Sequence, residues 1–355
     1  MDRAAPLQKM VWILLFAFLF TGGLIYARPF LVPLCFGGLL AMLFIPVSLW
    51  FEKLGLSRGL GIAACILLFV GILAGIVWLI SWQITDLASE ATQVETRLRE
   101  LIAKAQEFVR KHLGISLQQQ NEFLGNQAQG AGTFVSRISS SLAGFFVDLI
   151  LVLVYIFLFM YYRGRIKSFI LQLIPRGEQK NAQEIIQGIR KVSQQYVTGL
   201  GLMILSLWIM YSIGFSIVGV RYAILFAILC GLFELVPFIG NLTGNALAVL
   251  MVMIQGGGVG MIVGVLVTYA IVQFVQSYFL EPLVVGAEVN INPLFTIIGL
   301  VAGELIWGIA GLVLAIPLMG IIKIICDHIE ALKPYGYLIG SDGRKRRHTK
   351  QTAKR

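Results

Sequence analysis

The sequence predicts an all-α integral membrane protein that crosses the bilayer several times. Of its 355 residues, 58% are hydrophobic and only 13% are charged, which is too apolar a balance for a soluble chain of this length. Apolar runs of 18 or more residues recur, and each could cross a hydrocarbon core of about 30 Å as a helix. The ten-residue segments of alternating polarity that build a membrane β-barrel are absent from the sequence.

Eight hydrophobic segments make up the predicted membrane part. They cover residues 11–27, 29–51, 58–84, 140–162, 196–218, 221–254, 258–280 and 293–326. The first has the position of a signal peptide, but it lacks a small-residue cleavage site and another apolar segment follows at once. We therefore interpret it as a retained span. The four cysteines lie in apolar segments, and we expect no disulfide framework.

The distribution of Lys and Arg predicts the orientation. If the N-terminus is cytoplasmic and eight crossings alternate, the cytoplasmic pieces carry 19 basic residues and the short external links carry only Arg28 and Arg221. This asymmetry is what the positive-inside rule expects, so both termini are predicted to be cytoplasmic. Those cytoplasmic pieces are 1–10, 52–58, 163–195, 255–257 and 327–355.

The same interpretation divides the chain into six regions: membrane segments one to three (1–84), an extracytoplasmic insert (85–139), segment four (140–162), a cytoplasmic amphipathic linker (163–195), a C-terminal membrane core (196–326) and a basic cytoplasmic tail (327–355). We expect the linker to hold an interfacial helix, a break at 175–177 and a second helix. The tail contains RKRR at 344–347, and the chain has a net charge of +10. Next to a membrane, such a tail favours contact with anionic lipid over nucleic acid.

The insert begins with an amphipathic helix. Leu87, Ala91, Val94, Leu98, Leu101, Ala105 and Phe108 repeat in steps of four and three, which is an a/d seam over three heptads. A seam this narrow needs a partner helix. Two partners stay open: residues 117–139 of the same chain, or the same helix of another subunit in a homo-oligomer.

Segments six and eight are longer than one crossing requires. Residues 221–254 and 293–326 number 34 each, and as straight helices they would run about 50 Å. Pro237 and Gly240 interrupt one, and Gly308 and Gly311 interrupt the other. Both are therefore predicted to be broken or re-entrant helices, which at membrane depth are tolerated where the opened backbone faces protein or a watery cavity.

Each interrupted segment carries one glutamate near its break. Counted along a straight helix from the segment start, Glu234 and Glu304 lie at depths of about 20 Å and about 17 Å, near the middle of the membrane. Carboxylates at this depth are costly and mark ion or proton pathways. The alternative is that each only caps a half-helix. The candidate substrate- or ion-binding residues are Glu234, Pro237, Gly240, Asn241, Glu281, Pro282, Glu304, Gly308 and Gly311.

The C-terminal third resembles the autoinducer-2 exporter-like (AI-2E) transporter family, which consists of bacterial permeases. The matching elements are Glu281-Pro282, Gly286, Asn292-Pro293-Leu294, Gly303 through Gly311, Ala315-Ile316-Pro317-Leu318, and the P-x-x-G element from Pro237 to Gly240. Asn292 departs from the residue that members often carry there. The resemblance implies a multi-pass transporter of the bacterial cytoplasmic membrane that moves a small polar solute, such as the quorum-sensing furanone autoinducer-2, or acts as a Na⁺(Li⁺)/H⁺ antiporter.

Other classes of function have weaker support in the sequence. A passive oligomeric channel would use the seam of the insert, and a membrane scaffold would not need carboxylates beside paired breaks. We expect no enzyme, no cofactor and no metal site, because phosphate-loop, serine-hydrolase and zinc-protease motifs are lacking and the three histidines are scattered. The expected partners are the lipid bilayer, anionic lipid at the tail, a small polar solute or monovalent cation, and further copies of the chain, but no nucleic acid.

Overall fold

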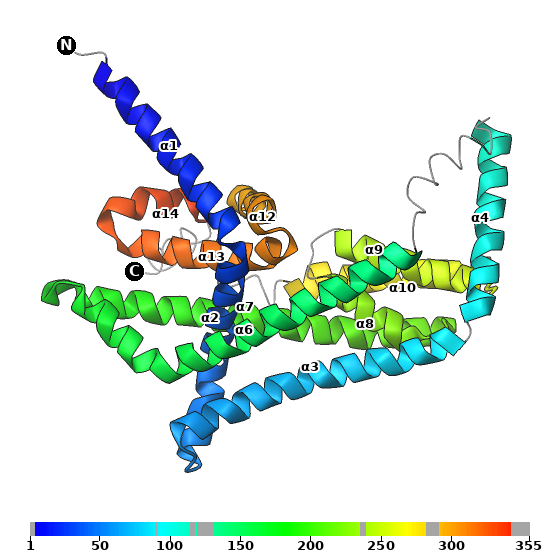
Figure 1. Ribbon diagram of the computed structural model, residues 1–355, viewed down its shortest axis with the longest axis horizontal. Coiled ribbons are helices and arrows are strands. Elements are labelled where there is room, and N and C mark those ends of the chain that lie inside the picture. The colour runs from blue at the N-terminus through cyan, green and yellow to red at the C-terminus, as the bar shows by residue number, and fades with distance from the viewer. Residues whose placement is uncertain are drawn as a thin grey trace, which may run out of the picture. The chain divides into compact units, whose positions relative to one another are not determined.

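The structure is a computed structural model that describes residues 4–89, 91–113, 118, 131–234, 239–281 and 291–341 (Figure 1). Within these ranges the chain is helical apart from turns and a single bridge between Ile291 and Gly340. Seven described helices are long and apolar enough to span a membrane, and three further apolar helices are shorter. The predicted class, an all-α multi-pass membrane protein, is confirmed.

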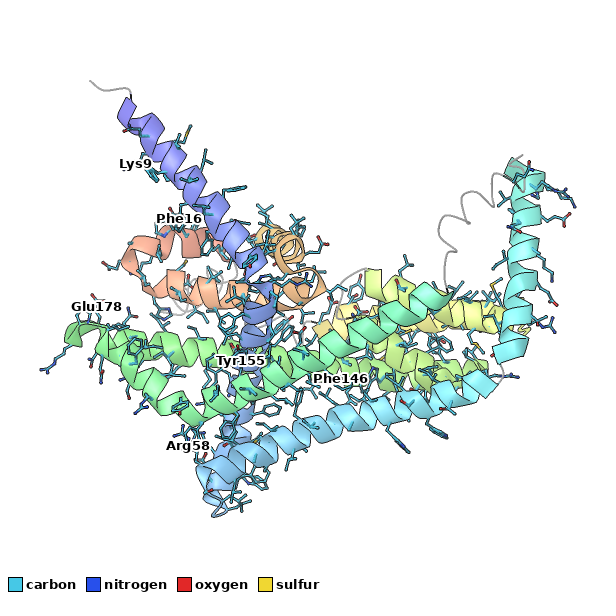
Figure 2. All side chains as sticks on the ribbon, viewed as in Figure 1. Lys9, Phe16, Arg58, Phe146, Tyr155 and Glu178 are labelled. Carbon is cyan, nitrogen blue, oxygen red and sulfur yellow. The ribbon has the colours of Figure 1, made fainter. Side chains whose placement is uncertain are left out.

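The first five predicted segments each lie within one helix. These five helices are α1 (Ala4–Tyr26), α2 (Arg28–Lys53), α3 (Arg58–Ser89), α6 (Ala131–Gln172) and α7 (Gln179–Val218). Helix α4 (Ala91–Leu113) lies between α3 and α6, and the 3-10 turn η1 (Arg176–Glu178) precedes α7. Large apolar side chains along α1, such as Phe16, are exposed (Figure 2), as expected of a helix surrounded by lipid.

The chain divides into two compact units. The first comprises residues 1–67, 148–200 and 282–355, and the second comprises residues 68–147 and 201–281. Helices α3, α6 and α7 each contribute residues to both units. The two interrupted segments fall in different units, segment six in the second and segment eight in the first.

In the first unit, polar contacts fix the C-terminal end of α2 and the first residue of α3 against α6. One guanidinium nitrogen of Arg163 donates to both carboxylate oxygens of Glu52, each at 2.9 Å, and Arg58 donates to the carbonyl of Met160 at 2.9 Å. Nearer the N-terminal end of α2, Gly37 leaves room for α6, because a Cβ there would lie 2.5 Å from the Cβ of Tyr155. Helices α2 and α6 are therefore in contact around Gly37 and Tyr155 and again around Glu52 and Arg163.

Segment six folds into a helical hairpin in the second unit. Its arms are α8 (Ala223–Phe233) and α9 (Ile239–Ile254), and α10 (Val259–Val275) with the π-helical turn η2 (Gln276–Leu280) follows. The two ends of the hairpin meet: the Gln255 side chain accepts from the Arg221 amide at 2.7 Å and donates to the Gly219 carbonyl at 3.1 Å. Arms of 11 and 16 residues measure about 16 Å and 24 Å, too short to cross alone.

Segment eight also folds back on itself, within the first unit. Helices α12 (Pro293–Trp307) and α13 (Ile309–His328) lie side by side (Figure 1), and η3 (Glu330–Leu332) and α14 (Lys333–Ile339) follow. The Asn292 amide donates to the Ile339 carbonyl at 2.9 Å, so the start of α12 lies beside the end of α14. The predicted interruption of both long segments is confirmed, and both take the form of hairpins.

The hairpins change the crossing scheme derived from strict alternation. That scheme put the 255–257 link and Arg221 on opposite sides of the membrane, whereas they lie at the same end of the α8–α9 hairpin. It likewise separated 281–292 from the tail, whereas Asn292 is bonded to Ile339. None of the moved pieces contains Lys or Arg, so the positive-inside count could not distinguish the two schemes.

The predicted linker and insert are continuous with the long helices. Helix α6 runs on to Gln172 and α7 starts at Gln179, with the expected break at 175–177 between them. In the insert, α4 contacts α9 within the second unit. Residues 119–130 lie outside the described residues, so a pairing of α4 with 117–139, or with another subunit, stays a prediction.

Candidate functional site

Glu234 lies at the tip of the α8–α9 hairpin. It is the residue that ends α8, where its amide donates to the carbonyl of Cys230 at 3.1 Å. Its half-buried carboxylate accepts a hydrogen bond of 2.6 Å from the side-chain amide of Gln276. The break predicted from Pro237 and Gly240 therefore places a carboxylate at a helix end, where it meets a polar group of α10's continuation.

Gln276 is the first residue of the π-helical turn η2 and is 1% exposed. Its amide nitrogen bonds Glu234, but its carbonyl oxygen has no hydrogen-bond donor among the described residues. A buried polar atom without a partner is costly, and π-helical turns within helices occur frequently at functional sites. As far as the described residues show, this carbonyl next to Glu234 can still accept a hydrogen bond or coordinate a cation.

Two more buried polar residues of the second unit lie near this pair. The side-chain amide of Asn245 on α9 donates to the hydroxyl of Tyr211 on α7 at 3.3 Å, and both residues are almost fully buried. Tyr211 and Glu281 each lie within electrostatic range of Glu234. We call Tyr211, Glu234, Asn245 and Gln276 the tip cluster.

Glycines and a tryptophan hold the hairpin in this shape. A Cβ on Gly240 would lie 1.6 Å from the carbonyl oxygen of Phe233, so only glycine lets α9 start this close to the end of α8. Gly231 lies beneath the ring of Trp208, whose indole N–H donates to the carbonyl of Ile228 at 3.1 Å and ties α8 to α7. Gly240 thus has a packing role at the tip.

Glu304 lies in the first unit, one turn before the tip of the α12–α13 hairpin. Its backbone carbonyl accepts from the Gly308 amide at 2.7 Å, while its side chain is exposed and has no recorded hydrogen bond or ion pair within the described ranges. The neighbouring Trp307 donates its indole N–H to the carbonyl of Leu24, close to the end of α1. Glu304 therefore lies near the α1–α2 junction, and its predicted depth near the middle of the membrane stays a prediction.

Gly308 and Gly311 shape this second tip. Gly308 has φ of +64°, a conformation that favours glycine, and a Cβ on Gly311 would lie 1.8 Å from the carbonyl oxygen of Gly303. The arms of the hairpin thus touch backbone to backbone. Both glycines were predicted as site residues, and their described contacts are those of a tight hairpin.

The structure describes the remaining predicted site residues only in part. Pro237 and Pro282 lie outside the described residues, as does the side chain of Asn241. Glu281 directly follows η2 and is exposed. The structure thus brings Glu281 into range of Glu234, and it places Glu304, Gly308 and Gly311 in the other unit.

The sequence interpretation overlooked Tyr211, Asn245 and Gln276. The available signal was an amide side chain inside an apolar segment: Asn245 in 221–254 and Gln276 in 258–280. Such groups are rare in membrane helices and face the protein interior. Among the described residues, no group of three or more His, Cys, Asp or Glu side chains could hold a metal ion. Oxygen ligands for a monovalent cation would come from Glu234 and Gln276.

The chain has apolar spanning helices, two interrupted segments and the tip cluster at one interruption. These are features of multi-pass membrane transporters. Comparison with known families agrees with this class: residues 12–331 match the family described as AI-2E family transporter. The chain belongs to that family, as its C-terminal motifs indicated.

Its relatives include several proteins whose names assign them provisionally to transport. YrrI of Bacillus subtilis is 23% identical over 324 residues, which cover 86% of this chain and 88% of that protein. YueF of the same organism is 25% identical over 335 residues, covering 89% and 90%, and YhhT of Escherichia coli K12 is 22% identical over 321 residues, covering 90% of each. The similarity therefore extends over nearly the whole length of these chains.

Proposed function

We propose that this protein moves a small polar solute or a monovalent cation across the bacterial cytoplasmic membrane. In this proposal Glu234 and Gln276 form a polar site on the transport pathway. The observation that carries the proposal is the 2.6 Å hydrogen bond between a carboxylate at a helix break and a buried amide whose carbonyl has no donor among the described residues. A pair buried only to stabilise the fold would be expected to satisfy both ends of the amide.

The pair suits an exchange of protons for cations. When Glu234 is ionised, the Gln276 amide nitrogen donates to it, as in the structure. When Glu234 is protonated, its O–H can donate to the Gln276 carbonyl, which accepts from no other group among the described residues. Replacement of that proton by Na⁺ or Li⁺ would use the same carboxylate and carbonyl oxygens, so the two ions compete for one place.

The other candidate residues take supporting roles in this proposal. Gly240 and Asn241 belong to the first turn of α9, after the break predicted at Pro237, and Glu281 and Pro282 follow the π-helical turn in the sequence. Glu304, with Gly308 and Gly311, forms a second, separate polar tip. A Na⁺(Li⁺)/H⁺ antiporter uses the pair directly, whereas an exporter of a polar solute such as autoinducer-2 uses it for coupling.

The arrangement in the membrane follows from the hairpins. If α1, α2, α3, α6, α7 and α10 each cross once and the hairpins return to their own side, the number of crossings is even. Both termini then lie in the cytoplasm, where the basic tail contacts anionic lipid. We further propose a homo-oligomer joined through the α4 seam.

Transport in sealed proteoliposomes that contain a pH-sensitive dye tests the site. With a proton gradient imposed, addition of sodium or lithium should cause dye recovery with the native protein. Recovery should be lost in Glu234→Gln and strongly reduced in Gln276→Leu. Glu178→Gln, which removes an exposed carboxylate from the η1 turn, is the matched control and should behave as native.

Each outcome decides between functions. Coupled recovery that persists in Glu234→Gln would remove the pair from the path, and Glu304→Gln would then be the variant to compare. A native protein that passes radiolabelled polar solutes without any response to cations would be an uncoupled permease or a passive channel, and Glu234 would be a helix cap. Equal elution and thermal stability of all variants exclude misfolding as the cause.

A further inference from the structure

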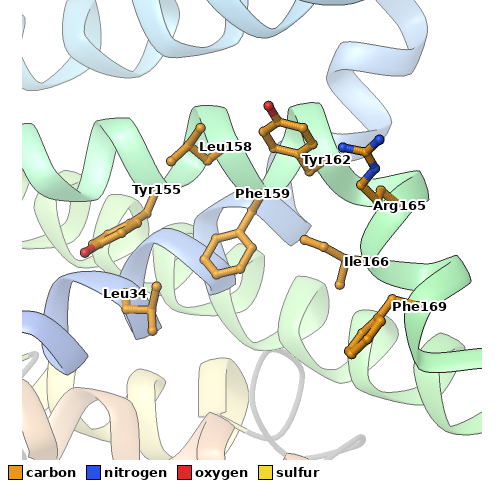
Figure 3. Close-up of a pocket in the computed structure, with 8 residues that line it drawn as sticks. All are labelled: Leu34, Tyr155, Leu158, Phe159, Tyr162, Arg165, Ile166 and Phe169. Atoms are coloured by element: carbon orange, nitrogen blue, oxygen red, sulfur yellow. The ribbon is translucent and has the colours of Figure 1, made fainter. Parts of the chain in front are cut away.

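An open, apolar groove of about 630 Å³ lies along α6 in the first unit. Leu34 of α2 lines it, together with one face of α6 that includes Tyr155, Phe159, Tyr162, Arg165 and Phe169 (Figure 3). These α6 residues recur every three or four positions, so they form a single stripe. None of the lining residues is acidic, and Arg165 is the only one with a charge.

The groove is held open by fixed neighbours. Gly38 of α2 faces the ring of Phe159, leaving 3.7 Å for an added Cβ, and the ring of Tyr155 packs edge-on against Phe30. At the other end of this stretch, the bond from Arg163 to both oxygens of Glu52 fixes the rotation of α6 about its axis. These contacts oppose a rotation of α6 that would turn the stripe away from α2.

Arg165 gives the groove one charged side chain, beside Tyr162 and one turn before Phe169. Neighbouring Arg163 is paired with Glu52, but Arg165 is exposed and has no recorded ion pair within the described part of the chain. It follows the apolar stretch of α6 directly, in the basic run Arg163, Arg165 and Lys167. From Tyr155 to Arg165 the helix rises about 15 Å, which equals the depth of one leaflet of a core of about 30 Å.

We propose that this groove binds one anionic phospholipid of the cytoplasmic leaflet, with its acyl chain along Leu34, Tyr155 and Phe159 and its phosphate at Arg165. The occupant follows from charge complementarity and length: between Tyr155 and Arg165 the groove is apolar over the depth of one leaflet, and Arg165, which has no ion pair among the described residues, lies beside a tyrosine suited to the headgroup level. This site is separate from the basic tail, because it is formed by α2 and α6, and it is independent of the transport proposal.

Native mass spectrometry of the full-length protein, released from micelles with phosphatidylglycerol or phosphatidylcholine, tests the site. The native protein should retain one phosphatidylglycerol in preference to phosphatidylcholine. Arg165→Gln should weaken that retention about fivefold, the effect of one basic residue near an anionic headgroup. Arg165→Lys should keep most of the retention, and Phe159→Trp, which fills the groove without a change in charge, should lower it.

The control is Arg176→Gln, which removes the same charge from the exposed η1 turn outside the groove. Equal losses in Arg165→Gln and Arg176→Gln would mean diffuse electrostatic attraction and overturn the proposal. Equal retention of the two lipids by the native protein would also overturn it. Displacement of phosphatidylglycerol by inorganic phosphate would show a phosphate site with no role for the acyl chain, which is a third result that contradicts the proposal.

Discussion

Replacement of Gly240 by alanine should open the α8–α9 hairpin and destabilise the protein. The added Cβ would lie 1.6 Å from the oxygen, 2.3 Å from the carbon and 3.1 Å from the Cα of Phe233. All three are backbone atoms, so no side-chain rotation relieves the clash, and the start of α9 must move by roughly 2 Å to restore van der Waals contact. Overpacking of this kind typically costs about 1–3 kcal/mol.

The matched control is Gly75→Ala in α3, where an added Cβ would meet nothing within 4 Å. Because alanine favours a helix over glycine by roughly 0.5–1 kcal/mol, this variant should be as stable as the native protein or slightly more so. Thermal unfolding of the purified proteins in the same detergent measures the difference. A Gly240→Ala protein that unfolds at the same temperature as Gly75→Ala would refute the close approach of α9 to Phe233.

Three further results are expected. Asn292→Ala should lower the free energy of unfolding by about 1 kcal/mol, because it removes the cap of α12 and the 2.7 Å hydrogen bond to Leu338. Proteolysis should then release the tail sooner, and an unchanged rate of cleavage would contradict this contact. Arg163→Ala should cost roughly 1.5–3 kcal/mol by thermal unfolding, since it leaves the partly buried Glu52 without its charged partner, and an unchanged unfolding temperature would contradict this. Single cysteines at Arg221 and Gln255 should react with a membrane-impermeant thiol reagent from the same side in intact cells, and labelling from opposite sides would exclude the hairpin.

Much of the architecture could be predicted from the sequence because bilayer thickness sets the length of a span. The six ordinary segments each correspond to one candidate spanning helix, and the excess length of 221–254 and 293–326 correctly indicated interruption. Proline and glycine located the breaks to within a few residues, since α8 ends at Phe233 and α12 ends at Trp307. These are local properties of the chain, which periodicity and composition report directly.

The fold-back of each segment was beyond the reach of the sequence pattern. A kinked crossing and a hairpin have the same composition, and the choice depends on contacts such as Gly303 with Gly311 and Gln255 with Arg221. Charge counting gave no help, because the relocated pieces lack basic residues. The sequence pattern likewise did not show that Glu304 lies one turn before the tip of a hairpin.

The candidate site, like the fold, could be predicted from the sequence only in part. Glu234 was conspicuous as a carboxylate in an apolar run, whereas Gln276 became meaningful only when α10 brought it to 2.6 Å from that carboxylate. The two are 42 positions apart in the chain. Pairings of this kind depend on tertiary packing, which a single sequence does not encode in its spacing.

The bond between Asn292 and Ile339 has a mechanical consequence. The last residue of α14 is hydrogen-bonded to the start of α12. A pull on the C-terminus therefore acts on α14 and, through this bond, directly on the α12–α13 hairpin. Adsorption of the basic tail to a charged surface would therefore put tension on that hairpin. A bulky fusion at the C-terminus would load the same joint, so reporter tags are better attached at the N-terminus, where α1 begins.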